Sequence, residues 1–443
     1  MKLYYDIKDK PKFPQLIVFA IQQLLAIMAA TLVVPIIIGN GMQPSAALFG
    51  AGAGTLVYAA FTKASSPVFL GSSFAFLGSM SAAFAGAVSA SAGYAGLIIG
   101  AIFAGLVYVV IALAIRFAGV NWINKLMPKQ VIGPTVAIIG LSLAGNAVGD
   151  LQCFVNGAPS SINVHAAVAC GLVTLFVTMI CSTYGKKSIK LIPFIIGILA
   201  GYAFAAVLTL IGTKLGNDSL KLIDFSVFSG ISVFALPEFT FLTAAKGIKE
   251  IDGAYIGTIA AAYLPVAFVV FAEHIADHKN ISSIIGKDLL DEPGLHRTLL
   301  GDGVGSMVGA FFGGCPNTTY GESVACVALT RNASVYTIIA AAIGAIIISF
   351  FEPFVAFVDS IPACVMGGVC MALYGFIAVS GLKMVKEVNL EDNRNLYTVS
   401  VILIAGIGGL TLGFGKITIT SIACALILGI ITNLVLSKAK TAE

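Results

Sequence analysis

The chain has 443 residues, of which 58% are hydrophobic and only 10% are charged, and its formal net charge is +4. A soluble protein of this length needs far more charge on its surface, so the composition excludes an ordinary soluble protein and predicts a membrane protein. The eight cysteines lie mostly within apolar runs without metal-ligand or redox spacing, and we expect them to be small buried hydrophobic residues.

The chain begins with a charged segment, MKLYYDIKDKPKFPQ, which has no hydrophobic region directly behind its charges and no small-residue cleavage site. We therefore expect a cytoplasmic lead-in to the first span and not a removable signal peptide. Spanning the hydrocarbon takes about 20 apolar residues as a helix. The apolar runs predict an all-α polytopic membrane protein with fourteen transmembrane segments, near 14–38, 44–62, 67–83, 93–115, 130–149, 163–183, 191–212, 254–276, 298–312, 318–330, 335–357, 363–381, 396–413 and 416–437.

Some parts of this pattern are irregular. Segments 3, 9 and 10 (67–83, 298–312 and 318–330) are too short or too interrupted to be ordinary helices. The polar stretch 214–253 is expected to be a lid or connector on the outside. In 279–302, apolar residues at helical spacing between charges predict a short interfacial helix that the DEPG sequence breaks. No linker separates a second soluble domain, so we expect residues 1–443 to form a single transmembrane domain.

The basic residues favour an orientation with both termini in the cytoplasm. With the N-terminus inside and fourteen crossings, 20 of the 25 Lys and Arg residues fall on the cytoplasmic side, as the positive-inside rule requires. The five basic residues left on the outside are Lys214, Lys221, Lys246, Lys249 and Lys416.

Two interrupted segments occupy matching places in the two halves of the chain. LGSSFAFLG (70–78) lies in segment 3 and CPNTTYGES (315–323) enters segment 10, and each has two hydroxyl residues followed by an aromatic residue. Seven segments per half would invert the second half relative to the first, and paired interruptions in inverted halves point to a transporter's central site. Irregular backbone in a membrane survives only where it faces protein or a water-filled cavity. The two breaks therefore predict a site where free amides meet a small planar polar solute.

Charged residues within membrane segments give a second indication of this site. Glu322 lies in segment 10, and Glu273, His274 and Asp277 lie near the end of segment 8. An ionised group at the bilayer centre costs roughly 2.5 kcal/mol or more, so such residues usually face a cavity and serve a function. Structural roles remain open for each: Glu322 as a helix cap, Glu273 as a satisfied carboxylate, His274 as a hydrogen-bonding residue and Asp277 as a solvated residue at the cytoplasmic edge.

Segment 1 adds the polar pair Gln22 and Gln23 inside a long apolar helix. This pair either hydrogen-bonds another helix or contributes to the site.

Several motifs make the chain resemble a known family. They are QQLLAIMAATLVVPIIIG (22–39), FLGSSFAF (69–76), AEHI (272–275), KDLLDEPGLHR (287–297), GGCPNTTYGES (313–323) and PACVMGGV (362–369). On these motifs, which span most of the chain, it resembles the nucleobase–ascorbate transporters, also called nucleobase:cation symporters of the second type. Within that family the likeness is closest to the bacterial uracil permeases.

The resemblance implies two inverted seven-span halves, approximately 14–212 and 254–437. A core domain would comprise segments 1–4 and 8–11, and a gate domain segments 5–7 and 12–14, with short strands in segments 3 and 10. It also implies a homodimer in the bacterial inner membrane, driven by the proton gradient, with no cofactor.

The resemblance carries site residues over to this chain. It implies substrate contacts at Glu273, Gly321 and Glu322, at the backbone of Phe74 and at Ala30. Glu273 and Asp277 would couple transport to protons. Supporting positions are Gln22, Gln23, Ser73, His274, Thr319 and Tyr320.

The chain departs from the family pattern at a few positions. Gln23 stands where a histidine is usual in segment 1, and Asp277 stands where uracil permeases often have histidine. After Glu322 the usual Asn-x-Gly is replaced by Ser323-Val324-Ala325. These changes bear on substrate range and proton coupling.

Uracil suits the proposed site because its two N–H groups can donate to two carboxylates and its two carbonyls can accept from backbone amides. A buried carboxyl group can also bind and release the coupled proton. The first alternative is xanthine, uric acid or a broader range of nucleobases, although purine carriers of the family typically have Gln in place of Glu322. A passive channel or an anion exchanger is a second alternative. An intramembrane enzyme using Glu273 and His274 is a third, against which no metal motif or nucleophile–base spacing is found. No nucleic-acid-binding motif is present.

Overall fold

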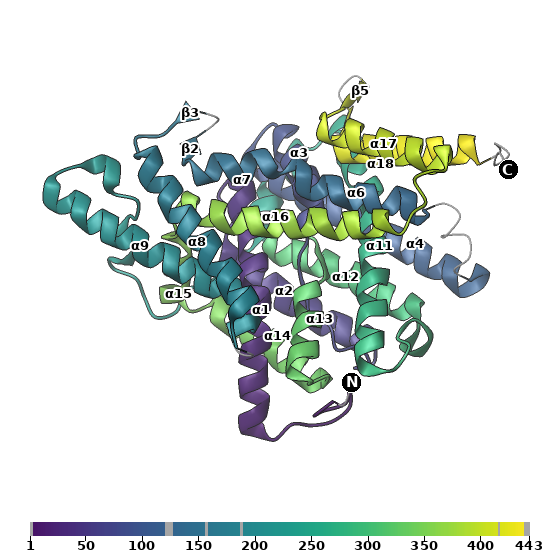
Figure 1. Ribbon diagram of the computed structural model, residues 1–443, viewed down its shortest axis with the longest axis horizontal. Helices are drawn as coiled ribbons and strands as arrows, with labels where there is room; N and C mark the ends of the chain where they lie inside the picture. Colours follow the sequence, from purple (N-terminus) through teal and green to yellow (C-terminus); the bar gives the residue numbers. More distant parts are fainter. Residues whose placement is uncertain (1–2, 120–126, 156–157, 187–188, 415–416, 438–443) are drawn as a thin grey trace.

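The computed structural model describes residues 3–119, 127–155, 158–186, 189–414 and 417–437. These residues fold mainly into α-helices joined by short loops (Figure 1). The helices are α1 (Phe13–Ile38), α2 (Pro44–Phe61), α3 (Leu77–Ala85), α4 (Ala90–Ala118), α6 (Lys129–Ser142), α7 (Ala144–Leu151), α8 (Val164–Tyr184), α9 (Pro193–Leu215), α10 (Thr240–Gly247), α11 (Gly253–Ile285), α12 (Leu295–Gly313), α13 (Gly321–Thr330), α14 (Val335–Ser349), α15 (Glu352–Asp359), α16 (Ala363–Lys386), α17 (Asn393–Ile407) and α18 (Ser421–Leu436).

Within the described ranges, eight helical spans are long and apolar enough to cross a membrane. They are Phe13–Ile38, Pro44–Phe61, Ala90–Phe117, Lys129–Leu151, Val164–Tyr184, Pro193–Leu215, Gly253–Ile285 and Ala363–Lys386. Shorter apolar helices include Gly321–Thr330, Val335–Ser349 and Ser421–Leu436. The molecule is therefore a multi-pass helical membrane protein, and the count of fourteen crossings stays a prediction.

Two expectations about local structure are wrong. Residues 298–312, expected to be too short or too interrupted for an ordinary helix, lie in the continuous 19-residue helix α12. The glycines of this segment serve close helix packing: a Cβ at Gly50 would lie 2.5 Å from the carbonyl oxygen of Gly309, so α2 and α12 approach backbone to backbone. The expected separate interfacial helix is also absent from the described residues, because positions 279–285 are the last turns of α11.

The DEPG sequence does break the helical path, as expected. It lies in the turn Leu290–Gly294 between α11 and α12, where Glu292 leaves helical geometry with φ −130° and ψ 115°. The stretch 214–253 contains only short elements, η3 (Asp218–Leu220), η4 (Phe225–Phe228), α10 and η5 (Ile248–Glu250). Its role as a connector fits these short elements, whereas its role as a lid stays a prediction.

The helices pack into two groups. In the first helix group, defined as α1–α4 and α10–α14, α12 packs along α2 and α4, and α14 packs along α2 and α1. In the second helix group, α6–α9 and α16–α18, α16 packs along α6 and α8, while α17 packs along α18 and α6. Figure 1 shows α6 and α16 running side by side, and α17 and α18 at the end of the second group. The roles of core and gate, and the inverted-repeat relation, stay predictions.

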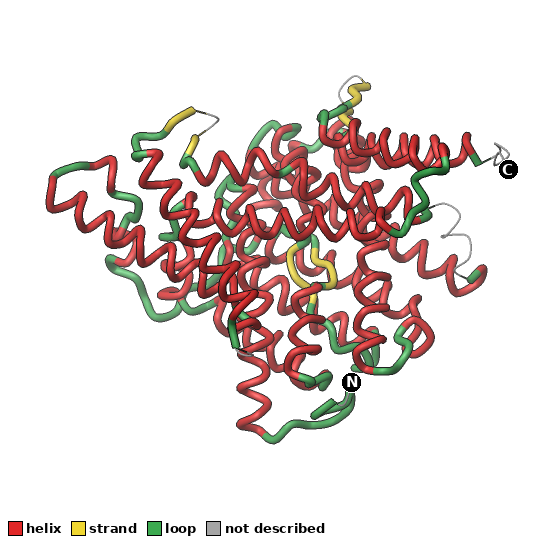
Figure 2. The backbone as a smooth tube through the Cα atoms, in the orientation of Figure 1, coloured by secondary structure: helices red, strands yellow, loops and turns green. Residues whose placement is uncertain are grey.

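A two-stranded antiparallel sheet lies near the centre of the molecule (Figure 2). Strand β1 (Leu70–Ser72) pairs with β4 (Asn317–Thr319), with Gly71 opposite Thr318. Each strand leads into a short helix, η1 (Phe74–Phe76) with α3 after β1, and α13 after β4. The predicted strands and breaks in these two segments are therefore confirmed. Two further described hairpins, β2–β3 (Phe154–Val155, Ala158–Pro159) and β5–β6 (Leu412–Phe414, Ile417–Ile419), lie away from this centre.

The N-terminal segment, residues 3–12, is fastened to the first helix group and is called here the N-terminal strap. The amide of Tyr4 donates to the carbonyl of Arg331 at 2.8 Å, and the amide of Val335 donates to the carbonyl of Ile7 at 2.9 Å. Ile7 is buried in an apolar cluster with residues from the ends of α11 and α13. The strap therefore holds these two helix ends together.

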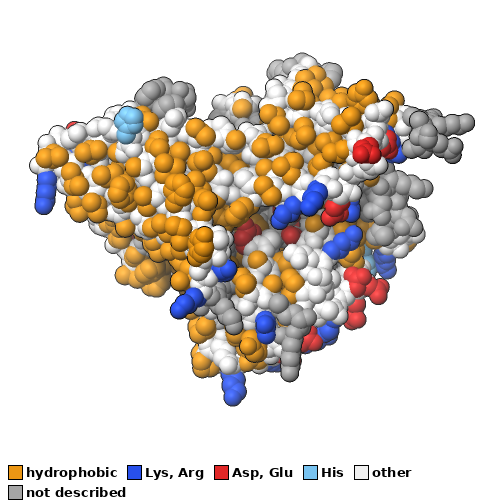
Figure 3. Space-filling model, viewed as in Figure 1, with side chains coloured by type: hydrophobic (Ala, Val, Ile, Leu, Met, Phe, Trp, Pro, Cys, Tyr) orange, Lys and Arg blue, Asp and Glu red, His pale blue; other side chains and the backbone are white. Residues whose placement is uncertain are grey.

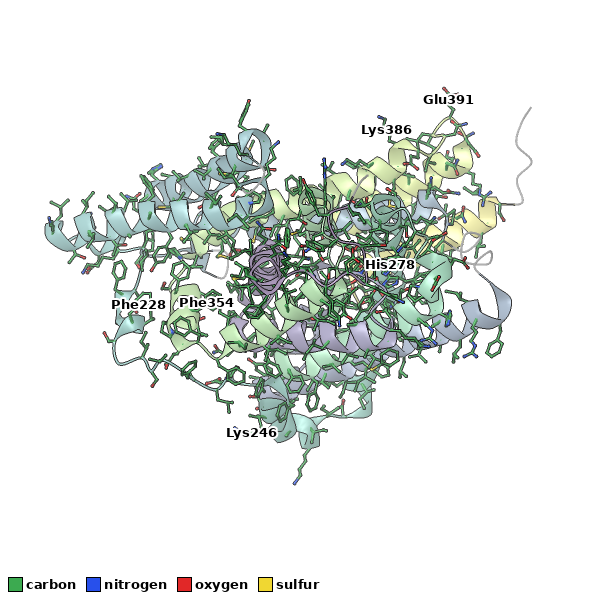
Figure 4. All side chains as sticks on the ribbon, turned by 90° about the horizontal axis from the view of Figure 1, so that it is seen from below. Phe228, Lys246, His278, Phe354, Lys386 and Glu391 are labelled. Carbon is green, nitrogen blue, oxygen red and sulfur yellow. The ribbon has the colours of Figure 1, made fainter. Side chains whose placement is uncertain are left out.

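Six of the basic residues used to predict orientation, Lys2, Lys125, Lys187, Lys416, Lys438 and Lys440, lie outside the described residues. Figure 4 places Lys246, expected outside, at the opposite edge of the molecule from Lys386, expected inside. The orientation with both termini in the cytoplasm stays a prediction.

Candidate functional site

A cavity of about 420 Å³ lies between the two helix groups. This size is within the range of small-molecule sites, roughly 300–1,000 Å³. Figure 3 shows a hollow near the centre of the face in view, with acidic side chains inside it and basic side chains around it. The cavity is lined by Ala26, Phe74, Ala75, Ile132, Val136, Ile139, Lys190, Pro193, Phe194, Ala272, Glu273, Ala276, Asp277, Thr318, Tyr320, Gly321, Glu322, Ala325, Cys326, Leu329, Leu373, Phe376, Ile377, Ser380 and Met384.

The acidic side of the cavity comes from α11 and α13. Glu273 and Asp277 are four residues apart on α11, so they lie on one face of that helix. Glu322 lies in the first turn of α13, directly after strand β4. The strand break thus brings the start of α13 against α11, so that Glu322, which is distant in sequence, lines one cavity together with the two carboxyl groups of α11.

Asp277 is fixed at the junction between β4 and α13. The hydroxyl of Thr319 donates to Asp277 Oδ2 at 2.7 Å, which is a short hydrogen bond to a carboxyl oxygen. A Cβ built on Gly321 would lie 3.8 Å from Asp277 Oδ1, which is an ordinary van der Waals distance. Gly321 is also exposed to the cavity. A ligand can therefore approach the backbone here closely.

The start of α13 supplies donors as well as a carboxyl group. The first amides of an α-helix have no partner within the helix and carry partial positive charge, which makes them suitable for a carbonyl or an anion. Tyr320 precedes this helix, and its hydroxyl donates to the carbonyl of Ser72 at 2.7 Å across the strand pair. Phe74, which follows the other strand, also lines the cavity and packs edge-on against Tyr374 with ring centroids 6.1 Å apart.

The opposite side of the cavity is apolar and comes from the second helix group. Helices α6, α9 and α16 contribute Ile132, Val136, Ile139, Pro193, Phe194, Leu373, Phe376, Ile377 and Met384. Among the described lining residues, polar side chains on this side are confined to Lys190 and Ser380. The cavity therefore has an acidic wall, on α11, α13 and the strand ends, and an apolar wall, on α6, α9 and α16.

Most of the expected substrate contacts lie at the acidic wall. Glu273, Glu322, Gly321 and Phe74 all line the cavity, as does the expected coupling residue Asp277. Ala30 does not: it is buried in an apolar cluster with residues of α1, α2 and α14. Ala26, one turn earlier on the same helix, lines the cavity instead.

The expected supporting residues lie at varying distances from the cavity. Tyr320 lines it, whereas Thr319 reaches it through its hydrogen bond to Asp277. Gln23 is buried and donates to the hydroxyl of Ser323, which in turn accepts the amide of Phe69 at 3.0 Å. Gln23 therefore ties α1 to the start of α13 and to the chain entering β1.

The remaining three expected residues do not line the cavity. Gln22 is half-buried, and its Oε1 atom has no hydrogen-bond partner among the described residues. Ser73 is buried, and its hydroxyl likewise has no partner within the described residues. His274 is fully buried and hydrogen-bonds to α12. The structure therefore places His274 in a hydrogen-bonded packing contact, which was one of the two roles left open.

Some residues of interest were missed by the sequence analysis. The apolar wall gives no sequence signal, because an apolar residue that faces a cavity resembles one that faces lipid. Asp302 was also missed, although a carboxyl group inside segment 9 is itself such a signal. Asp302 is fully buried and contacts His274. Among the described residues, no group of three or more His, Cys, Asp or Glu side chains is arranged to hold a metal ion.

The chain is similar in sequence to known transport proteins. The profile of the Permease family matches residues 14–414. The chain is 39% identical to a uracil permease of Bacillus caldolyticus, over 97% of this chain and 94% of that protein. It is 37% identical to a uracil permease of Bacillus subtilis, over 99% of this chain and 96% of that protein. It is 31% identical to a putative pyrimidine permease, RutG, of Escherichia coli, over 97% of this chain and 91% of that protein.

Solved structures resemble the fold at much lower sequence identity. The transmembrane domain of the cyanobacterial bicarbonate transporter BicA has a TM-score of 0.61 and 16% identity, covering 97% of this chain and 100% of that domain. The murine anion transporter Slc26a9 has a TM-score of 0.67 and 10% identity, covering 98% of this chain and 70% of that one. These likenesses show that the fold is one that membrane transporters adopt.

Proposed function

The chain belongs to the Permease family, and on that premise we propose that it takes up uracil across a bacterial inner membrane together with protons. The observation that carries the proposal is the acidic wall, where Glu273, Asp277 and Glu322 line one cavity beside the start of α13. The uracil permeases that are 37–39% identical over nearly the whole chain support uracil as the substrate. Proton coupling is proposed from the family resemblance and from the carboxyl groups of the acidic wall.

The acidic wall offers the groups that uracil requires. In the proposed complex, the two ring N–H groups donate to the carboxyl groups of Glu273 and Glu322, and the ring carbonyls accept from amides near Phe74 and Gly321. Each buried donor or acceptor left without a partner costs about 1–3 kcal/mol, so such a site discriminates strongly between bases. We propose that Ala26, rather than Ala30, is the α1 residue beside the ring.

Proton coupling is proposed to involve Glu273 first and Asp277 second. Both lie on the cavity face of α11, and Asp277 is joined to the strand through Thr319. Such a carboxyl group would bind a proton when uracil is present and release it on the other side of the membrane. The movement of uracil across the membrane would then be coupled to the movement of the proton. Two carboxyl groups on one helix face favour such a shared proton, because like charges at this spacing repel.

The overall arrangement in the membrane is proposed from the same features. We propose fourteen crossings in two inverted halves, with the first helix group as core and the second as gate, both termini in the cytoplasm and assembly as a homodimer. The cavity lining extends to Lys190, Leu329 and Met384, which neighbour the basic residues Lys186, Arg331 and Lys386 of the predicted cytoplasmic side. We therefore propose that the cavity opens toward the cytoplasm.

Uptake into proteoliposomes tests the proposed function. Labelled uracil should accumulate when an inward proton gradient is imposed, and a protonophore should remove the accumulation. Unlabelled uracil should compete fully, whereas xanthine and uric acid should compete weakly. Equal competition by xanthine would replace uracil with a broader nucleobase range, and uptake that ignores the protonophore would exclude proton coupling.

A further inference from the structure

Helix α11 carries two polar pairs at helical spacing, and only one of them faces the cavity. Glu273 and Asp277 line the cavity, whereas His274 and His278 are both fully buried in packing contacts with α12 and α2. The two imidazole rings stack with their centroids 4.0 Å apart. Figure 4 shows His278 in the interior of the molecule. Burying two imidazoles is costly unless their nitrogens are hydrogen-bonded. The partners of these four nitrogens therefore determine how the second pair is stabilised.

The protonation of His278 follows from its partners. Its Nδ1 atom lies 2.8 Å from the carbonyl oxygen of His274, which can only accept, so Nδ1 carries a proton. The Nε2 atom of the neutral ring can then accept from the hydroxyl of Tyr58, 2.7 Å away on α2. The Tyr58 hydroxyl also lies 2.8 Å from the hydroxyl of Ser66. His278 is thus a neutral side chain that fastens α11 to α2.

His274 is held at both nitrogens by α12. Its Nδ1 atom lies 2.7 Å from Asp302 Oδ2, and its Nε2 atom lies 3.0 Å from the hydroxyl oxygen of Thr298. Thr298 donates its own proton to the carbonyl of Leu295 at 3.1 Å, so Nε2 of His274 donates to Thr298. One further proton must lie between Nδ1 and the carboxyl oxygen, because two lone pairs would repel at 2.7 Å. The pair is therefore neutral overall, whichever atom carries that proton.

Asp302 depends on this contact. Its side chain is fully buried in α12, and its second oxygen, Oδ1, has no hydrogen-bond partner among the described residues. A buried carboxyl group that lost its single partner would be left unsatisfied, which is strongly unfavourable. His274 and Asp302 thus hold each other in one geometry.

We propose that His274 and Asp302 form a positioning pair that fixes the rotation of α11, so that Glu273 and Asp277 point into the cavity. Successive residues of an α-helix differ by about 100° around its axis. Holding the ring of His274 against α12 therefore sets the direction of the neighbouring Glu273, and the contact of His278 with Tyr58 does the same for Asp277 one turn later. The inference that this serves substrate binding rests on the proposed function.

Equilibrium binding of labelled uracil to purified variants tests the pair. Asp302→Ala removes the contact and should weaken uracil binding at least tenfold. In proteoliposome uptake, the same variant should raise the KM for uracil and change the turnover number less. Asp302→Asn can donate an amide N–H to the unprotonated Nδ1 of the neutral His274 ring, because Nε2 carries the ring proton, and should restore binding to within fivefold of the unmodified protein. Ser306→Ala is the control, one turn further along α12, where Ser306 lines a separate small cavity with Tyr108 and Asn317.

A second measurement reports the rotation of α11 without any substrate. Ala276 lines the cavity, so Ala276→Cys should react with a water-soluble maleimide, corrected for the reaction of the native cysteines. Adding Asp302→Ala should slow this labelling at least threefold, and Asp302→Asn should restore it. Thr298→Val, which removes the other partner of His274, should have a smaller effect in the same direction if Asp302→Ala yields too little folded protein.

Unchanged labelling of Ala276→Cys together with uracil binding within twofold of normal in Asp302→Ala would overturn the inference. So would an Asp302→Asn protein as impaired as Asp302→Ala, because charge and not position would then be required. Failure of the unmodified protein to bind uracil would instead remove the proposed substrate, while the labelling result would still decide the role of the pair.

Discussion

The two walls of the cavity differ in every property that matters for recognition. The acidic wall concentrates carboxyl groups, a helix start and a strand pair in the first helix group, whereas the apolar wall presents side chains such as Phe194 and Phe376 from the second helix group. Hydrogen bonds to a ligand need fixed geometry, but apolar contacts are not directional. From this difference we infer that the first helix group alone can recognise a ligand. The second helix group could then move along the ligand without breaking any hydrogen bond to it.

The largest effect on transport is expected when the proposed proton-coupling carboxyl group, Glu273, is removed from the acidic wall. Glu273→Gln keeps the shape of the side chain but cannot bind and release a proton. We expect proton-driven accumulation of uracil in proteoliposomes to disappear, while exchange of labelled for unlabelled uracil across the membrane persists. The control is Glu391→Gln, at an exposed residue outside the cavity. Accumulation that survives in the Glu273 variant would remove this residue from the coupling step.

A smaller but still large effect is expected for the second carboxyl group of the acidic wall. Glu322→Ala removes an acceptor for a ring N–H group, and a hydrogen bond to a charged group contributes about 1.5–3 kcal/mol, so uracil affinity should fall about 10- to 150-fold. Isothermal titration calorimetry of the purified protein with uracil measures this affinity. Leu329→Ala, on the same face of α13, should leave the affinity within threefold. Equal losses in both variants would mean that the wall acts through packing and not through its charge.

Truncating a side chain of the apolar wall should change the affinity for uracil much less. Most residues at an interface contribute under about 1 kcal/mol, so Phe376→Ala should change uracil affinity by less than about fivefold. We expect the rate of transport to change more than the affinity, because this wall belongs to the second helix group, which we propose to be the gate. A loss of affinity as large as that of Glu322→Ala would show that both walls recognise the substrate.

The smallest effect is expected outside both walls, in the N-terminal strap. Lys287 donates to Asp6 at 2.6 Å and lowers the pKa of that carboxyl group below its ordinary value of 3.8. A lowered pKa in the folded state stabilises the protein at neutral pH, and this contribution is lost as the pH falls through the folded-state pKa. Both side chains are about half exposed, so the contribution is at most about 1 kcal/mol.

Thermal unfolding of Asp6→Asn tests this at two pH values. The variant should be slightly less stable than the unmodified protein at pH 7, and the difference should shrink in acid as Asp6 becomes protonated. A difference that grows as the pH falls would have the wrong sign and would contradict the assigned contact.

The helices and the central breaks could be predicted because they follow from local properties. Long apolar runs must form helices in a membrane, and the hydroxyl, glycine and proline residues of LGSS and CPNTT interrupt them. The same logic failed for α12, because its glycines resemble an interruption although Gly309 provides room for the backbone of α2 at Gly50. Local composition does not reveal whether a glycine breaks a helix or allows it to pack.

The parts of the site that escaped prediction depend on tertiary packing. Ala26 lines the cavity and Ala30, one helical turn later, does not, and this is set by how α1 packs against its neighbours and not by its own sequence. The contact between His274 and Asp302 joins two helices across the turn that contains DEPG, and nothing in either helix alone selects the partner. Acidic residues were found because they are rare in apolar segments, whereas Phe376 is one of many apolar residues.

The pairing of β1 with β4 also has a consequence for how the protein is made. The two strands are separated by about 250 residues, which take about 12 to 50 s to synthesise at 5–20 residues per second. During that interval the backbone of Leu70–Ser72 is already translated, yet its partner strand does not exist. The nascent first half must therefore shelter these unpaired peptide groups at the translocon or in water until Asn317–Thr319 arrives.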